Sequence, residues 1–147
     1  MDRDAAATRR NGWEHFPHGA DIGVRGYGAT EAEAFAQAAT ALCAIVTDPH
    51  NVAEHQTVDV SCAAPDPELL LVDWLNALIY EMATRKMCFG RFHVRLDDGR
   101  LQGRAWGEPL DVARHEPTVE PKGATYTALR VAREPTGRWV AQCVVDV

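Results

Sequence analysis

The chain has 147 residues, of which 46% are hydrophobic and 24% are charged, and this is typical of a single globular domain. Its formal net charge of −6 disfavours direct nucleic-acid binding, which needs clustered cations to neutralise phosphates. No apolar run is long enough to cross a bilayer and no signal peptide is evident, so we predict a cytoplasmic protein without a membrane partner.

Residues 1–12 mix Asp, Arg and Ala without periodicity, so we predict a disordered N-terminal tail. Residues 13–147 then form one domain. In residues 18–28 apolar side chains alternate with others, which predicts a half-buried strand. Asp21 lies out of phase with the apolar positions, so we place it on the open face of that strand.

A helix is predicted next, because Thr30 and Glu33 form a capping box and apolar residues then recur at helical spacing. The pair Asp48-Pro49 ends it, since the residue before a proline is pushed out of the helical region. Residues 55–63 alternate and predict a second strand.

A second helix is predicted to begin with Asp66 as N-cap and Pro67 at its first position. Two hairpins then follow, joining residues 89–96 to 101–110 through Asp-Asp-Gly and residues 124–132 to 138–147 through Glu-Pro-Thr-Gly. The order is therefore β-α-β-α-β-β-β-β. It predicts an α+β two-layer sandwich, with two helices packed on one face of a mostly antiparallel sheet.

The last predicted strand ends with an acidic residue, Asp146, immediately before Val147. Asp146 lies opposite to the apolar phase of its strand, as Asp21 does in the first strand. If the two strands are neighbours, both carboxylates and the α-carboxylate of Val147 converge, and three oxygen donors suit a hard cation such as calcium or magnesium. The alternative is that both aspartates are solvated charges at strand edges.

Other candidate sites carry weaker signals. The spacing of His15 and His18 is compatible with zinc, although nothing supplies further ligands at motif spacing, and His18 also suits a hydrogen-bonding role at the strand entrance. Lys122 suits an anionic group or an ion pair with Glu120. A G-x-G at residues 26–28 hints at a phosphate loop but lacks a third glycine.

The sequence contains no nucleophile elbow, no cysteine–histidine arrangement for catalysis and no evident acid–base pair, so the residues alone indicate no reaction. The cysteines are far apart and form no C-x-x-C motif. We interpret them as reduced thiols of the core; they are Cys43, Cys62, Cys88 and Cys143.

The segments, taken in order, resemble the archease family from about residue 13 to the last. The strand PHGADIGVRGYG is similar to the family's D-H-T-A-D-I-G element, TEAEAF to its T-x-x-E-A-F helix, and LLLVDWLNALIYE to its L-L-x-x-W-L-N-x-L segment. GEPLD, His115 and KGATYT resemble its G-E, H and K-A-x-T-Y-H elements. The final VVDV matches the family's usual ending in D-V or D-I.

The resemblance implies a non-catalytic protein that activates the GTP-dependent RNA ligase of tRNA splicing and RNA repair, by promoting its guanylylation and multiple turnover. RNA would then be contacted only indirectly, through the ligase. It also implies a divalent metal site, usually described with calcium, made by Asp21, Asp146 and Val147. A general chaperone or interaction module with a structural metal is the alternative function, and a homo-oligomer stays compatible with the sequence.

The chain departs from the family pattern at three positions. Pro17 stands where the family has the leading Asp, Gly123 where it has Ala, and Thr127 where it has the His after T-Y. A role for that imidazole is therefore not carried over to this chain, and the roles of Lys122 and His18 stay open. The three implied metal residues are unaffected.

Overall fold

The computed structural model describes residues 12–147, so the predicted tail over residues 1–12 lies outside the described residues, apart from Gly12. The elements, in chain order, are β1 (Trp13–His18), β2 (Asp21–Gly28), α2 (Glu31–Val46), the 3-10 turn η1 (Pro49–Asn51), β3 (Gln56–Ala63), α3 (Pro67–Arg85), β4 (Met87–Asp97), β5 (Arg100–Pro109), α4 (Val112–His115), β6 (Gly123–Ala124), β7 (Arg130–Arg133) and β8 (Trp139–Asp146).

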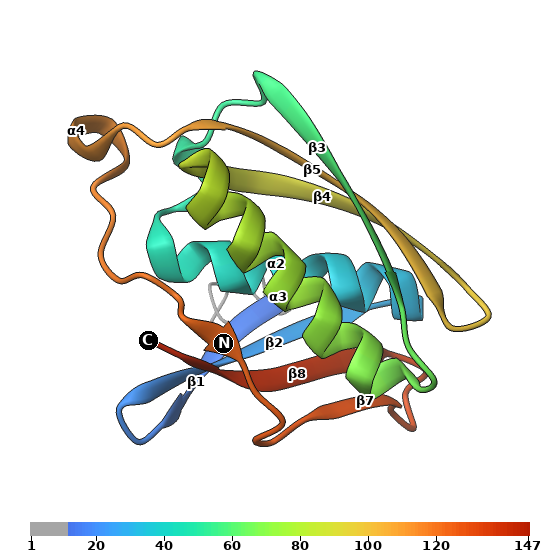
Figure 1. Cartoon of the computed structure of the whole chain (residues 1–147). Helices are drawn as coiled ribbons and strands as arrows, with labels where there is room; N and C mark the ends of the chain where they lie inside the picture. The colour runs from blue at the N-terminus through green and yellow to red at the C-terminus, as the bar shows by residue number, and fades with distance from the viewer. Residues whose placement is uncertain (1–11) are drawn as a thin grey trace.

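The strands form two antiparallel sheets, with α2 and α3 between them (Figure 1). The five-stranded sheet has the order β1-β2-β8-β6, with β7 also paired to β8, and the three-stranded sheet has the order β3-β5-β4. The predicted α+β class and the antiparallel pairing are confirmed. The strands are, however, divided between two sheets instead of one. Helix α2 is apolar around most of its circumference and therefore needs cover on two sides.

Both helices begin where the sequence predicts. The amide of Glu33 donates to Thr30 Oγ1 at 3.1 Å, and the amide of Ala29 donates to Glu33 Oε2 at 2.9 Å, so the capping box is complete. Asp66 caps α3 by accepting from the amide of Leu69 at 2.9 Å. These local bonds fix where each helix starts, and thereby which of its faces meets each sheet.

The core is tied together by the indole of Trp74 on α3, which is completely buried. Its Nε1 donates to the carbonyl of Phe35 on α2 at 3.1 Å. Its ring also packs against Gly103 on β5, where an added Cβ would lie 2.4 Å from the indole. One side chain therefore contacts α2 and the three-stranded sheet together.

The beginning of the sheet differs from the prediction of a single strand over residues 18–28. The chain instead makes a hairpin, in which β1 ends at His18, a turn follows at Gly19-Ala20, and Asp21 opens β2 opposite His18. Gly19 has φ +59°, a left-handed conformation that glycine adopts without steric cost. Asp21 therefore lies at a strand end rather than within a strand.

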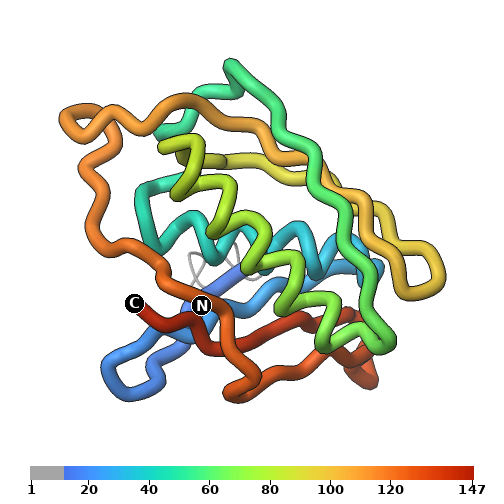
Figure 2. The backbone as a smooth tube through the Cα atoms, viewed as in Figure 1, coloured from blue at the N-terminus to red at the C-terminus, as the bar shows by residue number. Residues whose placement is uncertain are grey.

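The second predicted hairpin is also interrupted. Residues 124–132 do not form one strand, because a turn separates β6 from β7: the amide of Thr127 donates to Thr125 Oγ1, and Ala128 has φ +53°. Before β6, residues 116–122, which we call the strap, run from α4 past the end of α2 to the five-stranded sheet (Figure 2). The strap thus connects the two sheets along one side of the molecule.

Candidate functional site

Asp21 and Asp146 meet at one corner of the five-stranded sheet. Strand β2 begins at Asp21 and β8 ends at Asp146, and the two strands are antiparallel neighbours with Ile22 opposite Val145. The two aspartates are the next pair along, so both side chains point away from the helices. The amide of Val147 donates to Asp21 Oδ1 at 3.2 Å. We call these three residues the acidic corner.

Neighbouring strands hold the acidic corner in place. Gly123 on β6 pairs with Asp146, and the amide of Lys122 donates to the carbonyl of Asp146 at 2.8 Å. On the other side, His18 at the end of β1 is the register partner of Asp21. Asp146 is exposed, whereas Asp21 and Val147 are half-buried. The carboxylate of Asp146 is therefore exposed to solvent, while neighbouring strands on both sides hold the main chain of the corner in place.

The donors of the acidic corner fit a hard cation in type but are few in number. Within residues 12–147 no group of three Cys, His, Asp or Glu side chains is arranged to hold a metal ion. The corner supplies two carboxylates, so a cation there would also need main-chain oxygens at Val147 and water. Calcium accepts such mixed oxygen ligands, whereas zinc favours thiolate and imidazole.

Of the other sequence candidates, His18 and Lys122 flank this corner through main-chain pairing, whereas His15 and the G-x-G lie elsewhere. His15 Nε2 lies 2.7 Å from the carbonyl of Ala41 on α2, and because strand residues three apart face opposite sides, His15 and His18 do not share a site. Gly26 is a packing position rather than part of a phosphate loop, since an added Cβ would lie 2.2 Å from the amide nitrogen of Ala38. In the described part of the chain, no ion pair joins Lys122 to Glu120.

A second polar cluster, which the sequence did not reveal, surrounds Glu108 at the end of β5. Glu108 is 4% exposed and His115 is 3% exposed. Glu108 Oε2 accepts from the amide of Ala53 at 2.7 Å and lies 3.0 Å from His115 Nε2, while Oε1 pairs with the guanidinium of Arg114. The bond from Arg114, followed by that from Ala53, lowers the pKa of Glu108 to about 2.

This cluster resembles a catalytic triad in composition but not in geometry. Cys88 Sγ lies 3.5 Å from His115 Nε2, the same nitrogen that faces Glu108. His115 Nδ1 accepts from the amide of Asp111 at 2.8 Å, so Nε2 carries the proton and is not a base toward the thiol. Burial raises the pKa of Cys88 to about 11. The cluster is therefore a structural clasp that holds β5, α4 and the loop before β3 together.

The thiols are otherwise as the sequence predicts. All four cysteines are free, and Cys43, Cys88 and Cys143 are buried, while Cys62 is half-buried. Burial raises the pKa of Cys143 to about 12. None of these thiols within the described residues is therefore a ready nucleophile, because the thiolate is the reactive form.

No helix of the described chain is long and apolar enough to span a membrane.

Replacing Glu108 with alanine is expected to lower the free energy of unfolding by about 2–4 kcal/mol at pH 7, because the buried His115 and the half-buried amide of Ala53 lose their partner. Since the pKa of Glu108 is below its ordinary value of 4.5, its contribution is complete above that pH and is lost as the pH falls toward 2. Urea unfolding of wild type and variant should therefore differ less at pH 3 than at pH 7.

The control for this prediction is Glu54→Ala, which removes an exposed ion pair with Arg91. Such a pair contributes about 0–1 kcal/mol. Equal losses of stability in the two variants, or a Glu108 effect that does not change with pH, would show that the clasp does not stabilise the fold as described.

The chain is similar in sequence to the members of a single protein family. The model of the Archease protein family (MTH1598/TM1083) matches residues 13–147. The Protein archease of Pyrococcus furiosus is 40% identical over 139 residues, covering 92% of this chain and 98% of that protein. The Protein archease of Sulfurisphaera tokodaii is 34% identical over 137 residues, with the same shares covered.

Solved structures give the same result for the fold. The solution structure of Protein 1598 from Methanobacterium thermoautotrophicum has a TM-score of 0.81 and 31% identity, covering 92% of this chain and 99% of that chain. A Thermotoga maritima structure described as an archease, "possible chaperone", has a TM-score of 0.56 over 91% and 96% of the two chains. Its identity is 16%, so that likeness concerns the fold alone.

Proposed function

This chain belongs to the archease family, and from that premise we propose that it is a non-catalytic protein cofactor that activates a GTP-dependent RNA ligase by promoting its guanylylation and turnover. The observation that carries the proposal is the acidic corner, where Asp21 and Asp146 lie together at the ends of adjacent strands and Asp21 accepts the amide of Val147. The structural role of the Glu108 clasp supports a function without catalysis by this chain.

We extend the proposal to a divalent cation, calcium, at the acidic corner. Asp21, Asp146 and the main-chain oxygens of Val147 would hold it. The bound cation would offset the repulsion between the two carboxylates and present a positive charge at an exposed edge. Because Asp146 is exposed while its main chain is bonded to Lys122, its carboxylate is accessible to a partner without any rearrangement of the sheet.

Activation requires that the corner binds two states of the ligase unequally. A protein that bound both states with the same affinity would change neither population nor rate. A corner that carries two carboxylates and a divalent ion fits this requirement, because its charge can complement a partner's nucleotide and metal site in one state better than in the other.

The test is single-turnover guanylylation of the RNA ligase from the same genome, with this protein added in amounts well below the ligase concentration. The full-length chain is expected to increase the rate, and to sustain repeated rounds of ligation. An unchanged rate in the presence of folded protein would reject the activator function. The readout is formation of the covalent guanylate on the ligase.

The Thermotoga maritima protein is called a possible chaperone, and this motivates a second candidate function, that of a general chaperone with a structural cation. The two functions differ in selectivity. A chaperone would suppress aggregation of unrelated unfolded proteins as well as of the ligase, and removal of the cation with a chelator would act mainly by lowering the melting temperature. A selective effect on ligase guanylylation favours the activator.

A further inference from the structure

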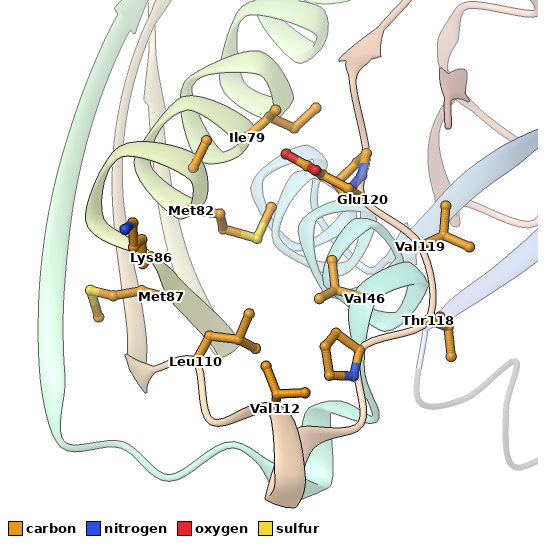
Figure 3. A pocket seen from close by; sticks show the side chains of 13 residues that line it. Val46, Ile79, Met82, Lys86, Met87, Leu110, Val112, Thr118, Val119 and Glu120 are labelled. Carbon is orange, nitrogen blue, oxygen red and sulfur yellow. The ribbon is translucent and has the colours of Figure 1, made fainter.

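An apolar groove lies between α3, the end of α2 and the strap (Figure 3). Its volume is about 530 Å³. Ile79 and Met82 from α3, Val46 from α2, and Leu110 and Val112 from the segment around α4 face into it. The charged residues among its lining are Lys86 and Glu120, which lie on opposite sides of the opening. A groove of this character accepts an apolar side chain rather than an ion.

Two exposed large hydrophobic side chains of the described chain lie in the lining of this groove. Val112 and Val119 line the groove and are 69% and 38% exposed. The other two exposed large hydrophobic side chains, Tyr80 and Tyr126, are not part of the groove lining. Exposed apolar and aromatic side chains concentrated in one region mark a protein interaction surface.

The last residues of the strap connect the groove to the acidic corner. Glu120 and Pro121 of the strap line the groove, and the amide of the next residue, Lys122, bonds to the carbonyl of Asp146. A stable protein complex buries about 800 Å² on each partner, which is far more than two aspartates and a chain end present. A partner that reaches the corner must therefore also cover neighbouring surface, and the strap leads directly into the groove.

We propose that the groove receives an exposed apolar side chain of the same RNA ligase whose guanylylation the acidic corner promotes; this inference rests on the proposed function. The corner supplies the charged contact and the groove supplies the apolar one. Met82 and Met87 in the lining suit this role, because the flexible thioether side chain adapts to the shape of what it contacts. The ligase would thus be held at two adjacent points of one surface.

The test uses the full-length double variant Val112→Glu/Val119→Glu. Both positions are exposed, so the fold is expected to survive, which a urea-unfolding curve checks. The charges oppose burial under an apolar side chain, and we expect the affinity for the purified ligase, measured by calorimetry, to fall about tenfold or more. At saturating concentrations the guanylylation rate should match that of wild type, because the corner is intact. Thr57→Glu, at an exposed position of β3, is the control and should bind normally.

The outcomes separate the two proposals. If wild type activates the ligase and the double variant binds it with unchanged affinity, the groove proposal alone is overturned. If wild type neither binds nor activates the ligase, the proposed function fails and the groove proposal fails with it. If light scattering shows wild type as a dimer that the double variant dissociates, the groove is an interface between copies of this chain, and the ligase is not its occupant.

Discussion

Replacing Asp146 with alanine is expected to abolish calcium binding and to reduce the acceleration of ligase guanylylation by at least the roughly 10–100-fold that loss of a group merely supporting a metal ligand costs, because Asp146 would itself be a ligand. The fold should be unchanged, because Asp146 is exposed and its main-chain bonds to Lys122 and Gly123 do not depend on the carboxylate. Calorimetric titration with calcium and the single-turnover assay measure the two effects separately.

The matched control is Asp97→Ala. Asp97 is also an exposed aspartate at the last position of a strand, but it lies on β4 of the other sheet. The Asp97→Ala variant should bind calcium and activate the ligase as wild type does. The conservative variant Asp146→Asn keeps the shape but removes the charge and is expected to fail like alanine. Full activation by Asp146→Ala would exclude the acidic corner from the mechanism.

Trp74→Ala is expected to lower the free energy of unfolding by about 3–5 kcal/mol, as large-to-small substitutions of buried aromatic residues do. The indole is completely buried and fills the space that Gly103 leaves open. Its loss also leaves the carbonyl of Phe35 without the donor that Nε1 provides. Urea unfolding at neutral pH gives the difference directly.

Trp106→Ala provides the comparison for this stability change. Trp106 is half-buried, faces away from the core on β5, and is covered by the guanidinium of Arg91 at 4.1 Å from the ring centre. Its loss is expected to cost about 1–2 kcal/mol, from partial burial and the cation–π contact. A Trp74 variant no less stable than the Trp106 variant would contradict the role given to Trp74 in joining the layers.

Local sequence signals predicted the fold well where the chemistry is local. Caps at Thr30 and Asp66 act over three residues, and the turn at Asp98-Gly99 requires two left-handed residues that Asp-Gly readily supplies. The turn at Gly19-Ala20 was missed, because Gly-Ala is not a preferred hairpin pair. The break between β6 and β7 was also missed, since it depends on a side-chain bond from Thr125 that alternation does not reveal.

The position of the candidate site required more than periodicity. The phase of each strand predicted open faces for Asp21 and Asp146, and in the structure Asp146 is exposed and Asp21 is half-buried. Whether the first and last strands pair cannot be read from alternation, because alternation shows which face of a strand is buried but not which strand lies beside it. The resemblance to the archease family implied that the strands carrying Asp21 and Asp146 are neighbours. The structure places Ile22 opposite Val145. The binding of a metal ion there stays a prediction.

Neither the Glu108 clasp nor the groove was predicted as a site, although GEPLD and His115 resemble elements of the family. Glu108 lies near the end of a strand whose charged residues are otherwise exposed. Its burial depends on Ala53, which comes from a distant segment, and on the way α4 folds back to bring Arg114 to the carboxylate. The strap has no periodicity, and its position is set by bonds from Thr118 to the end of α2 and from Lys122 to Asp146 on β8. Features made by loops that cross between sheets are visible only when the whole fold is known.

The central position of β8 determines the order in which the molecule can be assembled. Strand β8 pairs with β2, β6 and β7, all of which precede it in the chain, so during synthesis the five-stranded sheet cannot close before residues 139–146 leave the ribosome. Asp21 and Val147 are 126 residues apart, and contacts at such separation form slowly. The three-stranded sheet pairs within residues 56–109 and can form earlier. The acidic corner is therefore completed last, so only a copy whose sheet has closed presents it to a partner.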